Sequence, residues 1–151
     1  MPQSLSNLVV HLCFSTRDRE PWLQGMPVRN EFFHYLGGVS ANLGCPSIIT
    51  GGHVDHIHLL ARLSRTSSVA DWVKELKRTS SKWAKERFPE LREFQWQEGY
   101  GAFSVSQSGV DRVVHYIQEQ EAHHEKLSFQ EEFRTMLRKH EVAWDERYVW
   151  A

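Results

Sequence analysis

The sequence of 151 residues has only two cysteines, no long apolar run and a net charge of −1. Cys13 and Cys45 lack the spacing of a metal motif, which favours reduced thiols and a cytoplasmic protein. No apolar stretch approaches the ~20 residues of a membrane span, and the N-terminus lacks the pattern of a signal peptide. No glycine-rich phosphate loop of the Walker type is present, which argues against a nucleotide cofactor.

The near-neutral charge excludes a protein that is basic all over, but the charge is unevenly distributed. Between Arg62 and Arg87 there are eight lysines and arginines but only three acidic residues. Four of these bases recur at helical spacing, and two precede them at the end of a predicted strand. We interpret this basic stripe as a DNA-binding surface because we expect it to lie beside that strand and its histidines, although such a stripe is also typical of a solvated helix face. Its members are Arg62, Arg65, Lys74, Arg78, Lys82 and Lys85.

Hydrophobic periodicity predicts alternating strands and helices. Strands are expected over residues 7–14, 47–50 and 54–62 and in two pieces within 94–105, and helices over 28–43, 68–88, from 110 onward and around 129–137. Gly51 and Gly52 are expected to form the hairpin turn before the third strand. The order β-α-β-β-α-β indicates an α+β fold with a ferredoxin-like antiparallel sheet, helices on one face and extra C-terminal helices. One domain over 1–151 is expected, with a helical extension from about 129 to 151.

The segment Asp55-His-Ile-His-Leu59 places two histidines in the third predicted strand. Period-2 alternation sends His56 and His58 to one face and Ile57 to the other. Taken alone, such a pair also fits two hydrogen-bonded histidines in a half-buried strand. His11 and His53 are interpreted as structural.

Tyr116 and Gln120 are four residues apart and therefore share a face of the predicted third helix. Two imidazoles and an amide oxygen can bind a divalent ion that keeps its full charge and polarises a phosphodiester. A tyrosine oxygen can then exchange one phosphodiester bond for another without ATP, provided that its ordinary pKa of ~10 is overcome. His123 and His124 continue the same segment and are assigned no role.

These residues resemble the motifs of the HUH endonuclease superfamily, and more closely those of the single-tyrosine transposases of small bacterial insertion sequences, including the transposases associated with palindromic REP repeats. The matching stretches are His53-Val-Asp-His-Ile-His-Leu-Leu60, Trp96-x-x-Gly-Tyr-x-x-Phe-Ser-Val105 and Tyr116-Ile-x-x-Gln120-x-x-His-His124. The motifs are individually weak, but their order and spacing cover nearly the whole chain.

The resemblance implies cleavage and rejoining of single-stranded DNA with hairpin ends, through a 5′-phosphotyrosine, by a homodimer in the bacterial cytoplasm. It makes Tyr116 the nucleophile and His56, His58 and Gln120 the ligands of Mg²⁺ or Mn²⁺. Ligand softness alone favours manganese or zinc at imidazoles, so the ion stays open. Whether Tyr116 acts within its own subunit or on the partner's site also stays open.

Three alternatives remain. A relative retained by its host to process palindromic repeats has the same motifs as an active mobile-element transposase. A metal-dependent hydrolase without a covalent intermediate would use His53, Asp55, His56 and His58. A non-catalytic module that binds single strands would need neither the metal nor Tyr116. Asp55 fits an outer partner that orients a histidine ring, and it fits an ordinary loop aspartate before a strand equally well.

Overall fold

The computed structural model describes residues 2–151, which form four strands and five α-helices. In chain order these elements are β1 (Val9–Ser15), α1 (Met26–Asn42), β2 (Ser47–His53), β3 (His56–Arg62), α2 (Val69–Arg87), β4 (Gly101–Val105), α3 (Val110–Gln118), α4 (Gln120–His123) and α5 (Phe129–Lys139).

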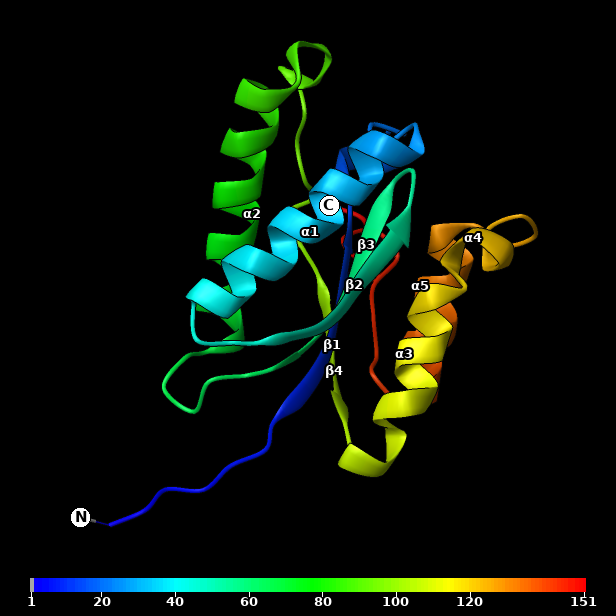
Figure 1. The fold of residues 1–151 in the computed structure, drawn as a ribbon. Coiled ribbons are helices and arrows are strands. Elements are labelled where there is room, and N and C mark those ends of the chain that lie inside the picture. The colour runs from blue at the N-terminus through cyan, green and yellow to red at the C-terminus, as the bar shows by residue number, and fades with distance from the viewer. Residues whose placement is uncertain (1) are drawn as a thin grey trace.

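The four strands form one antiparallel sheet in the order β2-β3-β1-β4, which is the ferredoxin-like arrangement expected from the element order. Helices α1 and α2 lie on one side of the sheet, and α3, α4 and α5 lie on the other side (Figure 1). The α+β fold class is thus confirmed, and the extra C-terminal helices cover the face that α1 and α2 leave free.

The larger core lies between the sheet and the α1–α2 layer. Alternate residues of β1 and β3, among them Leu12 and Ile57, contribute to it together with Phe32 of α1 and Trp72 of α2. Helix α2 begins where the sequence predicts, because the Ser68 side chain accepts a hydrogen bond from the Asp71 amide and caps the helix. The other residues of β3 therefore face α3 and α5.

The hairpin turn before β3 lies later than predicted. Strand β2 runs through both glycines to His53, which pairs with His56, so Val54 and Asp55 make the turn. Gly51 serves a different purpose, since a Cβ there would lie 2.6 Å from the Ile117 Cγ2 atom. The missing side chain lets α3 approach β2 closely.

Three further boundaries differ from the prediction. Of the two strand pieces expected within 94–105, only β4 forms, and Trp96 contributes a single bridge to Thr16. The third helix is interrupted, because α3 ends at Gln118 and the φ and ψ angles of Glu119, −98° and 18°, are not helical. The extension over 129–151 is helical only as far as Lys139, and turns follow.

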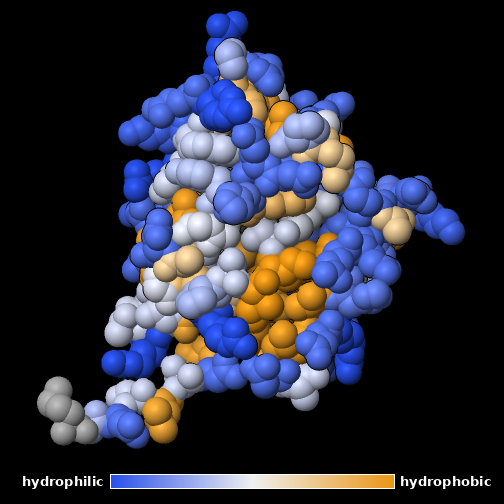
Figure 2. All heavy atoms as spheres, viewed as in Figure 1, coloured by the Kyte–Doolittle hydropathy of each residue, from blue (hydrophilic) through white to orange (hydrophobic). Residues whose placement is uncertain are grey.

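Apolar side chains gather on the surface between the start of β2 and α3 (Figure 2). Ile48, Ile49, Val113 and Val114 belong to this apolar β2–α3 surface and are only partly buried. In the part of the chain that the structure describes, strand β2 is an edge of the sheet and its outer backbone groups have no partner strand. Among the described residues, 2–151, no helix is long and apolar enough to cross a membrane.

Candidate metal and nucleophile site

Both histidines of β3 lie on the same face of the sheet, as the strand alternation predicts, and they point toward α5. Their side chains are fully buried, with 0% of their surface exposed. The Nε2 atoms of both rings approach the same oxygen, Glu132 Oε1 of α5, at 3.4 Å for His56 and 3.2 Å for His58. The rings are therefore enclosed, but they face a polar cluster instead of hydrocarbon.

A second group holds the other nitrogen of each ring. His56 Nδ1 lies 2.7 Å from Asp55 Oδ1, and His58 Nδ1 lies 2.8 Å from His11 Nε2. The carboxylate of Asp55 can only accept, so His56 donates from Nδ1. This contact fixes the orientation of the His56 ring and directs its Nε2 toward Glu132, as outer partners of metal-binding histidines do.

Gln120 joins the cluster although the helix break separates it from Tyr116. Its Nε2 donates to Glu132 Oε2 at 2.9 Å, which fixes the amide orientation and turns Oε1 toward His56 Nε2 at 2.8 Å. The four converging atoms are thus two imidazole nitrogens, one carboxylate oxygen and one amide oxygen.

His124 supplies a further ring at the edge of this group. Its Nε2 lies 3.0 Å from Gln120 Oε1 and 3.1 Å from Glu132 Oε1, while its Nδ1 lies 2.6 Å from the Leu127 carbonyl oxygen. Burial lowers the pKa of His124, but its hydrogen bond to Glu132 outweighs burial and leaves that pKa raised. The protonated form of His124 is thereby favoured beside the Glu132 carboxylate.

The remaining charges follow from the enclosure of the cluster. Burial lowers the pKa of His58, which favours the neutral ring that can act as a ligand. Burial raises the pKa of Glu132, but the surrounding histidines, His58 foremost, outweigh it and hold that pKa well below its usual range. Glu132 is therefore a carboxylate.

The donor set fits a divalent cation. Ligand atoms that lie about 2.0–2.2 Å from a common ion are roughly 2.8–3.6 Å apart, a range that includes the three distances from His56 Nε2 and His58 Nε2 to the oxygens of Gln120 and Glu132. With His56 donating from Nδ1, the lone pair of its neutral Nε2 would face two oxygens. Such an arrangement is unfavourable unless a proton or a cation lies between them.

The hydroxyl of Tyr116 donates a hydrogen bond to Glu132 Oε2. One carboxylate thus bridges the phenol and the histidine pair, with one oxygen toward each. Burial and the neighbouring Glu132 charge raise the pKa of Tyr116 well above its ordinary value. In this arrangement the phenol is protonated, and its attack on phosphorus would require transfer of that proton to a base.

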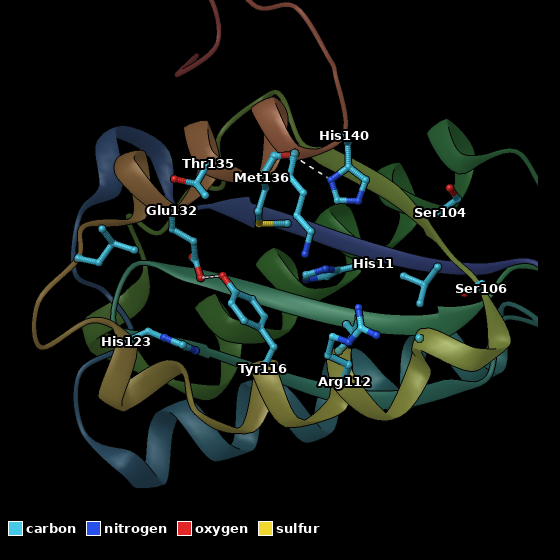
Figure 3. A pocket seen from close by; sticks show the side chains of 15 residues that line it. His11, Ser104, Ser106, Arg112, Tyr116, His123, Glu132, Thr135, Met136 and His140 are labelled. Carbon is cyan, nitrogen blue, oxygen red and sulfur yellow. Dashed lines mark hydrogen bonds between the residues drawn. The ribbon is translucent and has the colours of Figure 1, made fainter.

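A cleft opens between α3 and α5 beside this hydroxyl, with a volume of about 410 Å³ (Figure 3). Tyr116 and Glu132 point toward each other at one end, and His140 lies at the other end. We name it the α3–α5 cleft; among its lining residues are His11, Arg112, Tyr116, Glu132, Met136 and His140. It gives solvent a route to the hydroxyl, while the histidine pair lies behind Glu132.

The basic stripe lies elsewhere. Lys74, Arg78, Lys82 and Lys85 are on α2, on the face of the sheet opposite the histidine pair. Arg62 is the last residue of β3, and Arg65 follows it. Arg78 also pairs with Glu75 at 2.7 Å. The expected adjacency between the stripe and the histidines is therefore not found, and DNA binding by these residues stays a prediction.

Sequence reasoning missed Glu132, the residue that joins all parts of the site. A signal existed: Phe129, Phe133, Met136 and Leu137 form the inward stripe of α5, and Glu132 interrupts that stripe with a carboxylate. Such a charge on an apolar face requires a partner.

The hydrolase alternative expected four ligands, His53, Asp55, His56 and His58. Only His56 and His58 belong to the group whose ligand atoms lie within 4.8 Å of one another, and Glu132 is its third member. His53 and Asp55 lie outside this group, so the ligand set of the hydrolase alternative is not found.

Comparisons with known proteins identify the family and the fold of the chain. The family described as "Transposase IS200 like" matches residues 4–120. A candidate transposase from Deinococcus radiodurans R1 has a similar fold, with a TM-score of 0.65 and 23% identity over 80% of this chain and 95% of its own. A REP-associated tyrosine transposase bound to a REP hairpin has a TM-score of 0.60 and 13% identity over 82% of this chain and 72% of its own. The sequence has no significant match among curated proteins.

Proposed function

Because this chain belongs to the IS200-like transposase family, we propose that it cleaves and rejoins single-stranded DNA through a covalent phosphotyrosine on Tyr116. One observation carries the proposal: the Tyr116 hydroxyl is bonded to a carboxylate whose other oxygen faces the Nε2 atoms of His56 and His58. The phenol and the candidate metal ligands thereby share one enclosed site.

In the proposed step, the Tyr116 oxygen forms a bond to phosphorus and the bond from phosphorus to the 3′-oxygen breaks. The phenolic proton leaves along its hydrogen bond to Glu132 Oε2 and, because the pKa of that carboxyl is low, passes on to the leaving 3′-oxygen. The leaving 3′-oxygen takes up a proton and becomes a hydroxyl, so the DNA keeps one free 3′ end and one phosphotyrosine end. Attack of a 3′-hydroxyl on the phosphotyrosine reverses the step and rejoins a strand.

His56, His58 and Glu132, with the amide oxygen of Gln120, would hold Mg²⁺ or Mn²⁺. The bound ion supplies Lewis-acid polarisation of the phosphodiester. Asp55 and His11 keep the two rings oriented, and Gln120 holds the Glu132 carboxylate through its amide nitrogen. A carboxylate among the ligands favours these hard ions more than the ligand set expected from sequence.

The proposed substrate is a single strand with a hairpin, handled in the bacterial cytoplasm. The structural neighbour bound to a REP hairpin supports this class of DNA. An active mobile-element transposase and a host-retained relative that processes repeats differ in the DNA ends they recognise, so both remain within the proposal.

We further propose that Tyr116 acts within its own subunit, because the parts of the site come together in one chain. A homodimer stays part of the proposal, since the apolar β2–α3 surface lies along a strand edge that a second copy can cover. In this arrangement the dimer would organise two DNA ends and would not be needed to complete either site.

A trapping experiment tests the function. A pool of labelled hairpins flanked by randomised single strands is incubated with the protein and Mn²⁺ or Mg²⁺, and covalent adducts are separated on a denaturing gel. We expect an adduct only with the ion present, its loss in Tyr116→Phe, and its retention in the control Tyr35→Phe. Sequencing the trapped DNA would identify the recognised ends.

Three outcomes would contradict the proposal. An adduct that persists in Tyr116→Phe would show that Tyr116 is not the nucleophile. Cleaved DNA without any adduct would favour a hydrolase, and binding without cleavage under every ion condition would favour a non-catalytic module.

A further inference from the structure

The α3–α5 cleft has the character of a ligand pocket that the proposed step at Tyr116 does not itself use. Its volume of about 410 Å³ lies in the range of about 300–1,000 Å³ typical of small-molecule sites. Val113 of α3 and Met136 of α5 give it apolar walls, and the Tyr116 hydroxyl lies at one end. An apolar slot beside a nucleophile suits a flat ring that is connected to the reacting group.

Two cationic side chains stand at this cleft. Arg112 projects from α3 and Lys139 from the last turn of α5, and both are exposed. Within residues 2–151 neither of them forms an ion pair. Arginine and lysine that are not neutralised by carboxylates are the side chains that bind phosphate oxygens.

A directional acceptor completes the cleft. His140 packs on Phe103 with ring centroids 4.4 Å apart and donates from Nδ1 to the Met136 carbonyl oxygen at 2.9 Å. In the neutral ring the Nε2 atom is then an acceptor, and the contact fixes its direction. The exocyclic amino group or ring N–H of a nucleobase can donate to it.

We propose that the α3–α5 cleft binds one unpaired nucleotide next to the phosphodiester that Tyr116 attacks. Its base lies between Val113 and Met136 and donates to His140 Nε2, while Arg112 and Lys139 hold the phosphates on either side. This assignment rests on the proposed function and names the part of the protein that positions the strand. The cleft provides an apolar slot, an acceptor and two cations around a single nucleophile, which is the combination a nucleotide within a strand requires.

Binding measurements test the assignment without any cleavage. In a Tyr116→Phe background, fluorescence anisotropy is recorded with dye-labelled homopolymers of dA, dC and dT and with a ribose-phosphate oligomer that lacks bases. Arg112→Gln and Lys139→Gln are each expected to weaken binding severalfold and to reduce the salt slope by about 0.7, the value for one lost phosphate contact on single strands. Arg92→Gln removes one exposed charge away from the cleft and is the matched control.

The base slot is tested by filling it. Thr135 is an exposed residue of α5 that lines the cleft, so Thr135→Trp narrows the slot without disturbing the core. Binding of the homopolymers is expected to fall about tenfold, while binding of the oligomer without bases changes little. Circular dichroism verifies that each variant is folded.

A photocrosslink gives a readout independent of substitution. Oligo-dT carrying one 4-thiothymidine is irradiated with the Tyr116→Phe protein, and the attached peptide is identified by mass spectrometry. Attachment to residues 135–140 or to Val113 is expected. Attachment only to α2, or homopolymer binding unchanged by Arg112→Gln, Lys139→Gln and Thr135→Trp, would overturn the cleft assignment while leaving the phosphotyrosine proposal intact. If the wild-type protein forms no covalent adduct but the crosslink to the cleft is still found, the proposed function would be overturned and the cleft would remain a binding site.

Discussion

At the scale of single residues, the site depends on one carboxylate that belongs to an element far from the histidines in sequence. Glu132 lies 74 positions after His58, yet their side chains are 3.2 Å apart. The pair His56 and His58 was predictable because strand alternation is local. Glu132 was not predicted, because its partners become visible only when α5 packs on the sheet.

Glu132→Gln tests this carboxylate with nearly unchanged shape. Removing its charge is expected to weaken Mn²⁺ binding and to reduce adduct formation about 10- to 100-fold. Isothermal titration calorimetry measures the ion, and the denaturing gel measures the adduct. Glu131→Gln, on the exposed face of the same helix, is the control. Equal Mn²⁺ affinity in the two variants would show that Glu132 is not a ligand.

At the scale of the elements, the start of α2 was predicted more accurately than the hairpin turn before β3. Ser68 caps α2 at the predicted helix start, but Gly51 and Gly52 continue β2 instead of forming the turn, and Gly51 makes room for α3. No glycine or proline lies at the break at Glu119, so the sequence contains no signal for it. It accompanies contacts made by the next two residues, because Gln120 turns inward to His56 and Glu121 pairs with Arg29 of α1 at 2.6 Å.

The two capped helices make a matched pair for separating stability from function. Ser68 caps α2 and Ser128 caps α5, each by accepting a hydrogen bond from a backbone amide. Replacing either serine by alanine is expected to cost about 1 kcal/mol of unfolding free energy in urea titrations. Only Ser128→Ala is expected to lower Mn²⁺ affinity, because α5 carries Glu132. A similar loss of Mn²⁺ affinity in Ser68→Ala would show that the effect is global.

Lys77 connects α2 to the segment before β4, and the shift in its pKa leads us to expect that the stability of the fold depends on pH. Its ammonium donates to the carbonyl oxygens of Gln97, Glu98 and Gly99, at 2.7, 3.0 and 2.7 Å. Burial lowers the pKa of Lys77 to about 8 from the ordinary 10.5. Between these two pH values the unfolded chain binds more protons, so this lysine makes the folded state gain stability as pH rises.

The gain from Lys77 is expected to be about 1–2 kcal/mol, after discounting for its partial exposure. Urea unfolding of the wild type and of Lys77→Met from pH 7 to pH 10 measures it as a difference between the two curves. Lys74→Met, an exposed lysine of the same helix, controls for the general effect of alkaline pH. Parallel curves for the wild type and Lys77→Met would contradict the assigned shift.

At the scale of the whole molecule, the order of elements was sufficient to predict the sheet, but not the function of its second face. The sequence pattern predicts helices α1 and α2 over one face, and the α1–α2 core confirms it. Helices α3, α4 and α5 cover the opposite face (Figure 1), and the histidine pair, the tyrosine and the α3–α5 cleft lie on that side of the sheet. The basic stripe of α2 was predicted to lie beside the site, but it lies on the other face of the sheet. The sequence could not show this, because the order of elements does not reveal on which side of the sheet a helix packs.

Mixing two inactive variants tests whether one subunit contains the complete site. Tyr116→Phe and His58→Asn are each expected to form no adduct, and their mixture is expected to remain inactive, because every chain lacks one part of its own site. The variants are refolded together and incubated with the hairpin pool and Mn²⁺, and light scattering reports the mass of the assembly. Restored adduct on the His58→Asn chain would show that the tyrosine acts across a dimer.

The tight pairing of His53 with His56 has a consequence for how the gene can vary. Since the turn of Val54 and Asp55 sets the register of β3, inserting or deleting one codon there would invert the strand and send both imidazoles into the α1–α2 core. A substitution in the turn can weaken the site to a small or a large extent, but a change in the length of the turn would displace both imidazoles completely. The length of this hairpin is therefore expected to be invariant among active descendants, even where its residues diverge.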